Sequence, residues 1–197
     1  YLFGVSGVVG LPSGGFAVGN SGTQQLFLFE ESGQFIRAVG GQGEGPGELQ
    51  AVWGLSICAG GQLAVRELSR VSFFDTRGEF LRTVRIPGHL AESRAGFEGI
   101  SEDCQRALMS LPPRDPPSSR DELRDLHSTY YWASVETGAA DTIGTLNVRY
   151  AQAREFRGQL VWSRVPYGPE GVLAVHPEGI ALASGRAPEV TVLNENG

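Results

Sequence analysis

The sequence predicts an all-β fold of the β-propeller type, built from four-stranded antiparallel blades. Three observations predict it: the chain repeats itself with a period of about 45 residues, turn-forming residues divide each repeat into four short segments, and helical periodicity is almost absent. Repeats of this length are typical of folds in which one small structural unit is stacked many times. We therefore expect a single propeller domain over residues 1–197, with blade repeats at about 1–47, 48–95, 96–150 and 157–197.

The first repeat shows how each blade is expected to fold. Runs separated by Gly, Pro, Ser and Asn predict four strands, at Val5–Leu11, Phe16–Gly19, Gln25–Glu30 and Phe35–Val39. The third strand of a unit is apolar on both faces, as in the segments 26–29, 71–74 and 190–193. A sheet with one solvated face alternates instead. Both faces should therefore be covered, and packing of blade against blade covers them without helices.

A glycine-rich connector follows the first repeat and reads GQGEGPGEL from Gly41 to Leu49. Together with the turn LPSGG at Leu11 and the pattern FxxxGxF at Phe29 and at Phe74, it resembles the exported six-bladed β-propellers of the bacterial NHL-repeat type. The resemblance implies a six-bladed ring and an extracytoplasmic location, periplasmic or secreted. At about 45 residues a blade the chain holds about four blades, so we expect part of a six-bladed ring, truncated at both ends. Closure of four blades into a complete ring is the alternative.

Composition excludes several classes of function. The formal net charge is -6, from 16 basic and 22 acidic residues, which argues against a nucleic-acid or anionic-lipid partner. All basic residues are Arg, so Schiff-base chemistry, lysine general bases and the phosphate-loop lysine are excluded. No run reaches the ~20 apolar residues that cross a bilayer, so we expect no membrane span in this segment.

The two cysteines, Cys58 and Cys104, fall near equivalent positions of consecutive repeats. Their spacing is not of the CxxC or zinc-ligand type. We interpret them as two separate buried thiols, and a disulfide in an exported protein is the alternative.

In a four-stranded propeller blade, the connection from strand four to the next strand one and the connection from strand two to strand three lie on the same face. We call this the loop-rich face, and it surrounds one mouth of the central channel. Three unusual segments should lie on it: the 41–48 connector, the 87–94 connector and an insertion at 110–129. The first either cradles an anion or is a structural crossing, and the strand that follows it favours the crossing because anion cradles are normally followed by a helix.

The insertion replaces a short turn by about twenty residues, which is typical of functional or disordered loops. Its paired prolines predict an extended first half. Ser119 with Glu122 forms a capping-box pattern, which predicts a short helix carrying Leu123 and Leu126. We interpret the insertion as a lid or partner-binding flap.

The predicted function is a non-enzymatic binding module that recognises a protein, peptide or carbohydrate (glycan) ligand on the loop-rich face. It needs no cofactor, and no catalytic residue is assigned to it. The candidate binding residues are Asn20, Glu48, Glu67, His89, Arg94, Arg120 and His127. The alternative is a divalent-metal-dependent hydrolase or lyase, lactonase-like or amidating-lyase-like, at the channel mouth. There Asn20, Glu48, Glu67, His89 and His127 would be ligands of Ca²⁺ or another divalent cation.

Overall fold

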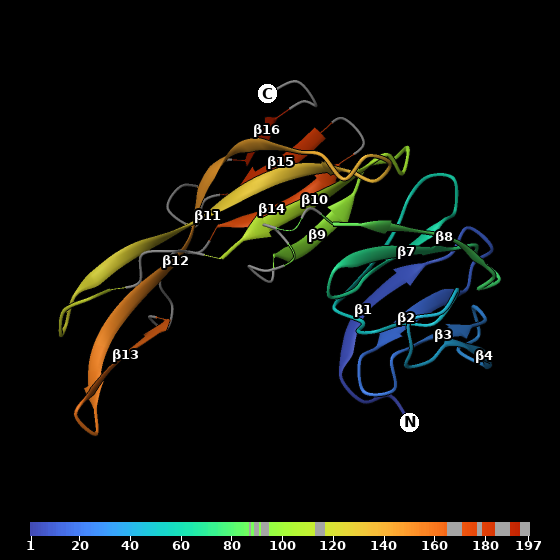
Figure 1. The fold of residues 1–197 in the computed structure, drawn as a ribbon, viewed down its shortest axis with the longest axis horizontal. Coiled ribbons are helices and arrows are strands. Elements are labelled where there is room, and N and C mark those ends of the chain that lie inside the picture. Colours follow the sequence, from blue (N-terminus) through green and yellow to red (C-terminus); the bar gives the residue numbers. More distant parts are fainter. Residues whose placement is uncertain are drawn as a thin grey trace.

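The computed structural model describes residues 1–86, 88, 91, 95–112, 117–164, 171–176, 179–183 and 190–193. All sixteen named elements of these residues are strands, and they form four separate antiparallel sheets (Figure 1). The all-β prediction is confirmed. Among the same residues there is no helix with the length and apolar character needed to cross a membrane.

The strands follow one another in space in the order of the sequence. The first sheet holds β1 (Val5–Gly10), β2 (Phe16–Asn20), β3 (Gln25–Phe29) and β4 (Phe35–Gly40). The second holds β5 (Gly54–Ile57), β6 (Leu63–Arg66), β7 (Arg70–Phe74) and β8 (Phe80–Arg85). The third holds β9 (Gly96–Ile100), β10 (Arg106–Leu111), β11 (Leu123–Ser134), β12 (Ala140–Phe156) and β13 (Gln159–Arg164). The fourth holds β14 (Val172–His176), β15 (Gly179–Ala183) and β16 (Val190–Leu193).

The sheets pack face to face, with their first strands side by side. Strand β1 contacts β5, β5 contacts β9, and β9 contacts β14. A separate apolar core fills each junction: Leu26 and Leu63 belong to the first, Phe73 and Met109 to the second, and Leu108 with nearby residues to the third. Cores between sheets, with first strands gathered on one side, are the packing expected of propeller blades.

The predicted strands of the first repeat agree with the observed ones to within one residue at each end. Burial on both faces is found where a sheet has neighbours on both sides, since Val71 through Phe74 of β7 are all buried. It fails for β16, where Val190 and Val192 are 66% and 54% exposed. Among the described residues no further sheet covers that face of the fourth sheet.

The third sheet departs most from the repeat. Strands β11 and β12 are 12 and 17 residues long, and β13 adds a fifth strand beside β12. β10 pairs with β11 only from Thr129 onward. The first half of β11 is therefore paired with β12 alone, and it extends beyond the rest of the sheet (Figure 1). We call residues 117–128 and 147–164 the arm. The predicted boundary at 157 would assign β13 to the fourth repeat, whereas the structure pairs it with the third sheet.

A disulfide joins the second and third sheets. Cys58 lies after β5 and Cys104 just before β10, with their Cα atoms 5.5 Å apart. The interpretation as two separate thiols is wrong. Because neighbouring blades pack in register, equivalent turns meet at the same edge, and the distance falls within the range that a disulfide spans.

Candidate functional site

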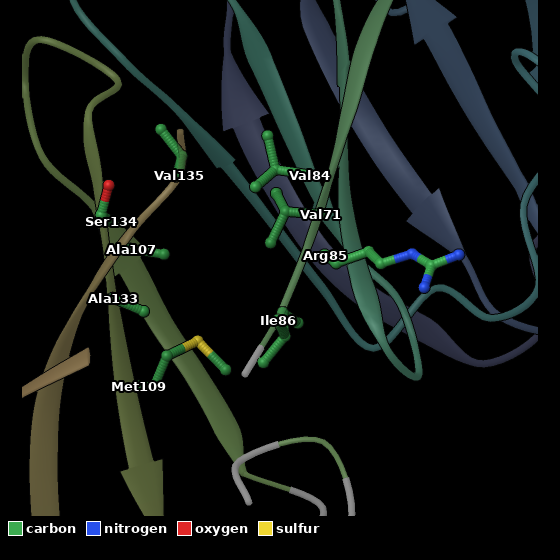
Figure 2. Close-up of a pocket in the computed structure, with 9 residues that line it drawn as sticks. All are labelled: Val71, Val84, Arg85, Ile86, Ala107, Met109, Ala133, Ser134 and Val135. Carbon is green, nitrogen blue, oxygen red and sulfur yellow. The ribbon is translucent and has the colours of Figure 1, made fainter. Parts of the chain in front are cut away.

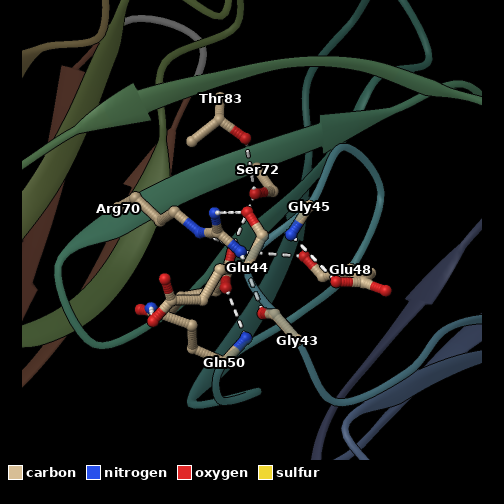
Figure 3. A network of polar contacts seen from close by, with 9 residues as sticks. Gly43, Glu44, Gly45, Glu48, Gln50, Arg70, Ser72 and Thr83 are labelled. Carbon is tan, nitrogen blue, oxygen red and sulfur yellow. Dashed lines mark hydrogen bonds and ion pairs between the residues drawn. The ribbon is translucent and has the colours of Figure 1, made fainter.

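The glycine-rich connector is folded around one arginine, Arg70 at the start of β7 (Figure 3). The guanidinium donates from Nη2 to the Glu48 carbonyl at 2.8 Å and to the Gly43 carbonyl at 3.5 Å, and from Nη1 to the Glu44 carbonyl at 3.2 Å. Several connector N–H groups are bonded within the chain as well, including those of Gly41, Gly43 and Gly45. These N–H groups are therefore not free to cradle an anion, and the contacts favour the structural crossing.

Glu67 lies at the centre of the same network, and its side chain is 0% exposed. Its Oε1 accepts from Arg70 Nε at 2.9 Å and from Ser72 Oγ at 2.5 Å, while Oε2 accepts from the Gln50 N–H at 2.7 Å. Ser72 in turn contacts Thr83 Oγ1 at 2.9 Å (Figure 3). The carboxylate thus joins the turn between β6 and β7 to the connector and to β8, and three donors occupy it.

Glu48 is exposed and folds back onto its own loop. Its Oε2 accepts from the Gly45 N–H at 2.9 Å. A β-carbon built on Gly43 would lie 2.0 Å from the same oxygen, so residue 43 must be glycine for the carboxylate to reach this position. Glu48 and Glu67, separate candidates in the sequence, both contact Arg70, Glu48 through its backbone carbonyl and Glu67 through its carboxylate.

Asn20 occupies the position in the first sheet that corresponds to Glu67. It is 0% exposed, and its Oδ1 accepts from the Phe3 N–H at 2.9 Å. Its Nδ2 donates to Thr23 Oγ1 at 2.9 Å and to the Tyr1 carbonyl at 3.4 Å. Asn20 therefore fixes the turn between β2 and β3 to the segment before β1.

The remaining candidates do not join this network. His127 is exposed on β11, opposite Asn147 of β12, and Arg120 lies at the start of the arm. The Arg120 side chain is 70% exposed and is 3.6 Å from Asp121 and 3.5 Å from Glu155, so these ion pairs contribute little. His89 and Arg94 lie outside the described residues. Among the described residues, no three His, Cys, Asp or Glu side chains are grouped so that they could hold a metal ion.

The predicted helix in the insertion is wrong. Leu123 and Leu126 lie in strand β11, where Leu123 is 50% exposed and Leu126 is buried. One half of the capping box does form. The backbone N–H of Ser119, that of Ser118 and the Ser119 hydroxyl donate to Glu122 at 2.9, 2.8 and 3.0 Å, and they lower the pKa of Glu122 to about 2. The pattern therefore stabilises a turn before a strand rather than the start of a helix.

Three residues that are not among the sequence candidates also lie at the loop-rich face. Trp53, just before β5, and Leu68, in the turn after β6, are 41% and 45% exposed. Arg66, the last residue of β6, is 0% exposed, and none of its three side-chain nitrogens has a hydrogen-bond partner in the part of the chain that the structure describes. Its Cζ lies 5.3 Å from the centroid of the Trp53 ring. The sequence feature that points to Arg66 is a charged residue at the end of an apolar run, Leu63, Ala64 and Val65. Every residue of that run is buried in the structure.

Hollows lined by described residues also lie elsewhere. Between the second and third sheets a void of about 10 Å³ is lined mainly by apolar residues, among them Val71, Val84 and Met109, together with Arg85 and Ser134 (Figure 2). It has room for about one water molecule and is a packing defect. On the face opposite the loop-rich face, a groove of about 430 Å³ is lined by the turns after β1, β3 and β7 and by the start of β4, with Glu31, Arg37 and Arg77 among its residues.

Comparison with known proteins supports the fold. Residues 13–92, less than half of the chain, match the model of the DUF5128 family, described as a 6-bladed beta-propeller. The fold is that of a β-propeller. A candidate exported protein from Bacteroides fragilis NCTC 9343 is similar over 98% of this chain and 50% of its own, with a TM-score of 0.55 and 15% identity. No curated protein matches the sequence significantly.

Two lyases share the fold. Virginiamycin B lyase from Staphylococcus aureus gives a TM-score of 0.50 at 9% identity, over 92% of this chain and 63% of that protein. A streptogramin B lyase gives a TM-score of 0.50 at 10% identity, over 98% of this chain and 66% of that protein. The chain thus spans half to two thirds of the length of these three proteins. At these identities the likeness shows the fold alone.

Proposed function

We propose that this propeller is a non-enzymatic binding module and that its loop-rich face holds a protein, peptide or carbohydrate ligand. The observation that carries the proposal is the pairing of a rigid polar scaffold with exposed apolar side chains. Trp53 and Leu68 stand exposed beside turns whose buried Asn20 and Glu67 are fully engaged. A partly exposed aromatic residue on a fixed backbone is typical of binding hot spots, because little side-chain entropy is lost when a ligand covers it.

The polar candidates support binding better than catalysis. A metal ligand or general base needs a free lone pair facing the substrate. The carboxylate of Glu67 accepts three hydrogen bonds and the amide of Asn20 is bonded through both of its polar atoms. Both side chains are also 0% exposed, so a substrate or metal ion would reach them only after these contacts were rearranged. Their present contacts instead hold the loops in one arrangement, which lowers the entropic cost of binding.

The same proposal includes an NHL-repeat architecture and a location outside the cytoplasm. The Cys58–Cys104 disulfide supports that location because such bonds persist in oxidising compartments. The similarity to a candidate exported protein supports it as well.

The test is binding to an array of peptides and glycans by the wild type and by two variants. In the first, Trp53→Ala is combined with Leu68→Ser. In the control, Arg77→Ala changes the opposite face, where the Arg77 side chain is 82% exposed. Signals from specific ligands should fall more than about tenfold in the first variant and remain in the control. Equal binding by all three proteins, or loss in the control alone, would show that the ligand binds elsewhere.

The alternative is a metal-dependent hydrolase or lyase, and two proteins of similar fold are named as lyases. Metal analysis and lactone, ester and streptogramin turnover assays on the same preparation address it. Stoichiometric bound metal together with turnover would replace the binding-module proposal.

A further inference from the structure

We propose that Arg66 anchors a carboxylate of the ligand, so that the loop-rich face recognises a carboxylate-bearing peptide. The inference rests on the proposed function, because it names the chemical class of ligand for that face. It starts from an imbalance between two arginines at either end of one turn, Arg66 and Arg70.

Arg70 donates several hydrogen bonds, whereas the Arg66 guanidinium donates none to the described residues. Arg70 donates to the Glu67 carboxylate and to three carbonyls of the connector. Arg66 is 0% exposed, yet its Nε, Nη1 and Nη2 have no hydrogen-bond partner among the residues that the structure describes. An uncompensated buried charge is strongly destabilising. The nearest acid in sequence, Glu67, already accepts from Arg70, Ser72 and Gln50 on the other face of the strand.

The position of Arg66 gives a ligand a route to it. Arg66 pairs with Gly54 of β5, and a β-carbon on Gly54 would lie 3.0 Å from Phe97 and 3.7 Å from Arg66 Cβ. Arg66 therefore lies on the side of the second sheet that faces the third, at the loop-rich end of its strand. The Trp53 ring covers it at 5.3 Å and is itself 41% exposed. Trp53 is thus one of the side chains that cover the guanidinium, and the proposed route to Arg66 passes through a rotamer change of this ring.

The stacked ring compensates the charge in part and leaves the N–H groups unused. A cation over the face of Trp is attracted by the ring, but that contact uses none of the five N–H donors of the guanidinium. Burial lowers the pKa of Arg66 to about 10, against the opposing effect of Glu67, so the side chain is still a cation at neutral pH.

A carboxylate fits these free donors best. The planar guanidinium binds a carboxylate through two parallel hydrogen bonds, which are strongest where water is excluded. The overall charge of -6 disfavours a polymer that carries an acid on every unit, such as a polyuronate. The exposed Trp53 and Leu68 favour apolar groups beside the acid. A peptide with one carboxylate among apolar side chains meets all three conditions.

The first experiment uses sodium acetate as the carboxylate probe and follows the unfolding temperature and tryptophan fluorescence, with chloride and sulfate at matched ionic strength. The proteins are the wild type, Arg66→Met, Arg66→Lys and the control Arg82→Met. Arg82 is matched because it also stacks on a ring, that of Phe73 at 4.2 Å, but it donates to Gln62 Oε1 at 2.9 Å.

Acetate should raise the unfolding temperature of the wild type and of Arg82→Met saturably, by about 5 °C near saturation, and should change their fluorescence. Arg66→Met should show neither effect, and without acetate it should be at least as stable as the wild type. Arg66→Lys should need more than about tenfold more acetate, because an ammonium lacks the two-pronged geometry. That variant also decides the question if Arg66→Met fails to fold.

The inference is overturned if acetate has no effect beyond that of chloride in the wild type, or if it has an equal effect in Arg66→Met. A response to sulfate alone would assign the site to a tetrahedral oxyanion and reject the carboxylate. The peptide array separates this inference from the proposed function. Unchanged peptide binding by Arg66→Met would reject the role of Arg66 and leave the binding-module proposal intact. An acetate response that depends on Arg66, with no ligand found on the array, would support the carboxylate site and reject the binding-module proposal.

Discussion

Removal of the disulfide between Cys58 and Cys104 should destabilise the protein by an amount that follows from the chain it encloses. The two cysteines are 46 residues apart in sequence. Chain-entropy theory gives a cross-link over such a loop about 13 cal/mol/K, or about 4 kcal/mol at room temperature. Reduction of the wild type, or the double variant Cys58→Ala with Cys104→Ala, should therefore lower the free energy of unfolding by up to about 4 kcal/mol.

Urea unfolding followed by circular dichroism measures this difference. The oxidised wild type should resist alkylation, because both cysteines are 4% exposed and bonded, and its intact mass should be lower by two hydrogens than that of the reduced form. The reduced wild type is the control for the double variant, since its sequence is unchanged. The reasoning would be refuted if oxidised and reduced wild type unfolded with free energies within about 0.5 kcal/mol of each other.

Three further predictions concern single positions. Gly33 and Gly78 have φ of 85° and 83° in equivalent turns. A β-carbon on Gly78 would lie 2.3 Å from a valine methyl of the first sheet, whereas a β-carbon on Gly33 would have no atom within 4 Å. In thermal unfolding, Gly33→Ala should therefore lower the free energy of unfolding by about 1 kcal/mol, and Gly78→Ala should lower it by at least about 1 kcal/mol more. Arg70→Met should lower the free energy of unfolding in urea by about 3 kcal/mol, because the Glu67 side chain is 0% exposed and loses its counter-charge. A variant as stable as the wild type would contradict this. The pKa of Glu122 is lowered from 4.5 to about 2, so its carboxylate stabilises the turn fully above pH 4.5, and this stabilisation is lost as the pH falls through about 2. In an NMR titration, the amide chemical shifts of that turn should therefore change near pH 2 and not near pH 4.5.

The regular part of the fold was predictable because local and long-range signals agree there. Each blade is made of short strands joined by tight turns, so turn residues alone locate the strands of the first repeat. Burial on both faces needs a neighbour on each side, which is why Phe73 fits the expectation and Val192 does not. The sequence of a strand shows which of its side chains are apolar, but whether a neighbouring sheet covers them depends on the arrangement of the sheets.

The arm was not predictable by the same route. Leu123 and Leu126 have helical spacing, and a capping pattern precedes them. The competing signal is an alternation in β11, where Leu126, Ser128, Tyr130 and Trp132 are buried and the residues between them are more exposed. Strand β11 gains its hydrogen bonds from β12, and Leu123 pairs with Gln152. Pairing with β12, which is distant in sequence, overrides the local helical preference of β11. The helical spacing and the capping pattern do not indicate this pairing.

The alternation of side chains along β6 and the residue after it explains why one turn carries both the rigid network and the unpaired charge. Val65 belongs to the core shared with the first sheet, and Ala64 to the core shared with the third. Since successive side chains point to opposite faces, Arg66 faces the third sheet and Glu67 the first. The connector bonds reach Glu67 and Arg70 on the first-sheet side, and none of them reaches Arg66. The backbone around Arg66 is thus held from one side, while on the other side its guanidinium has no hydrogen-bond partner among the described residues. The proposed recognition of a carboxylate would use these donors on an already ordered backbone.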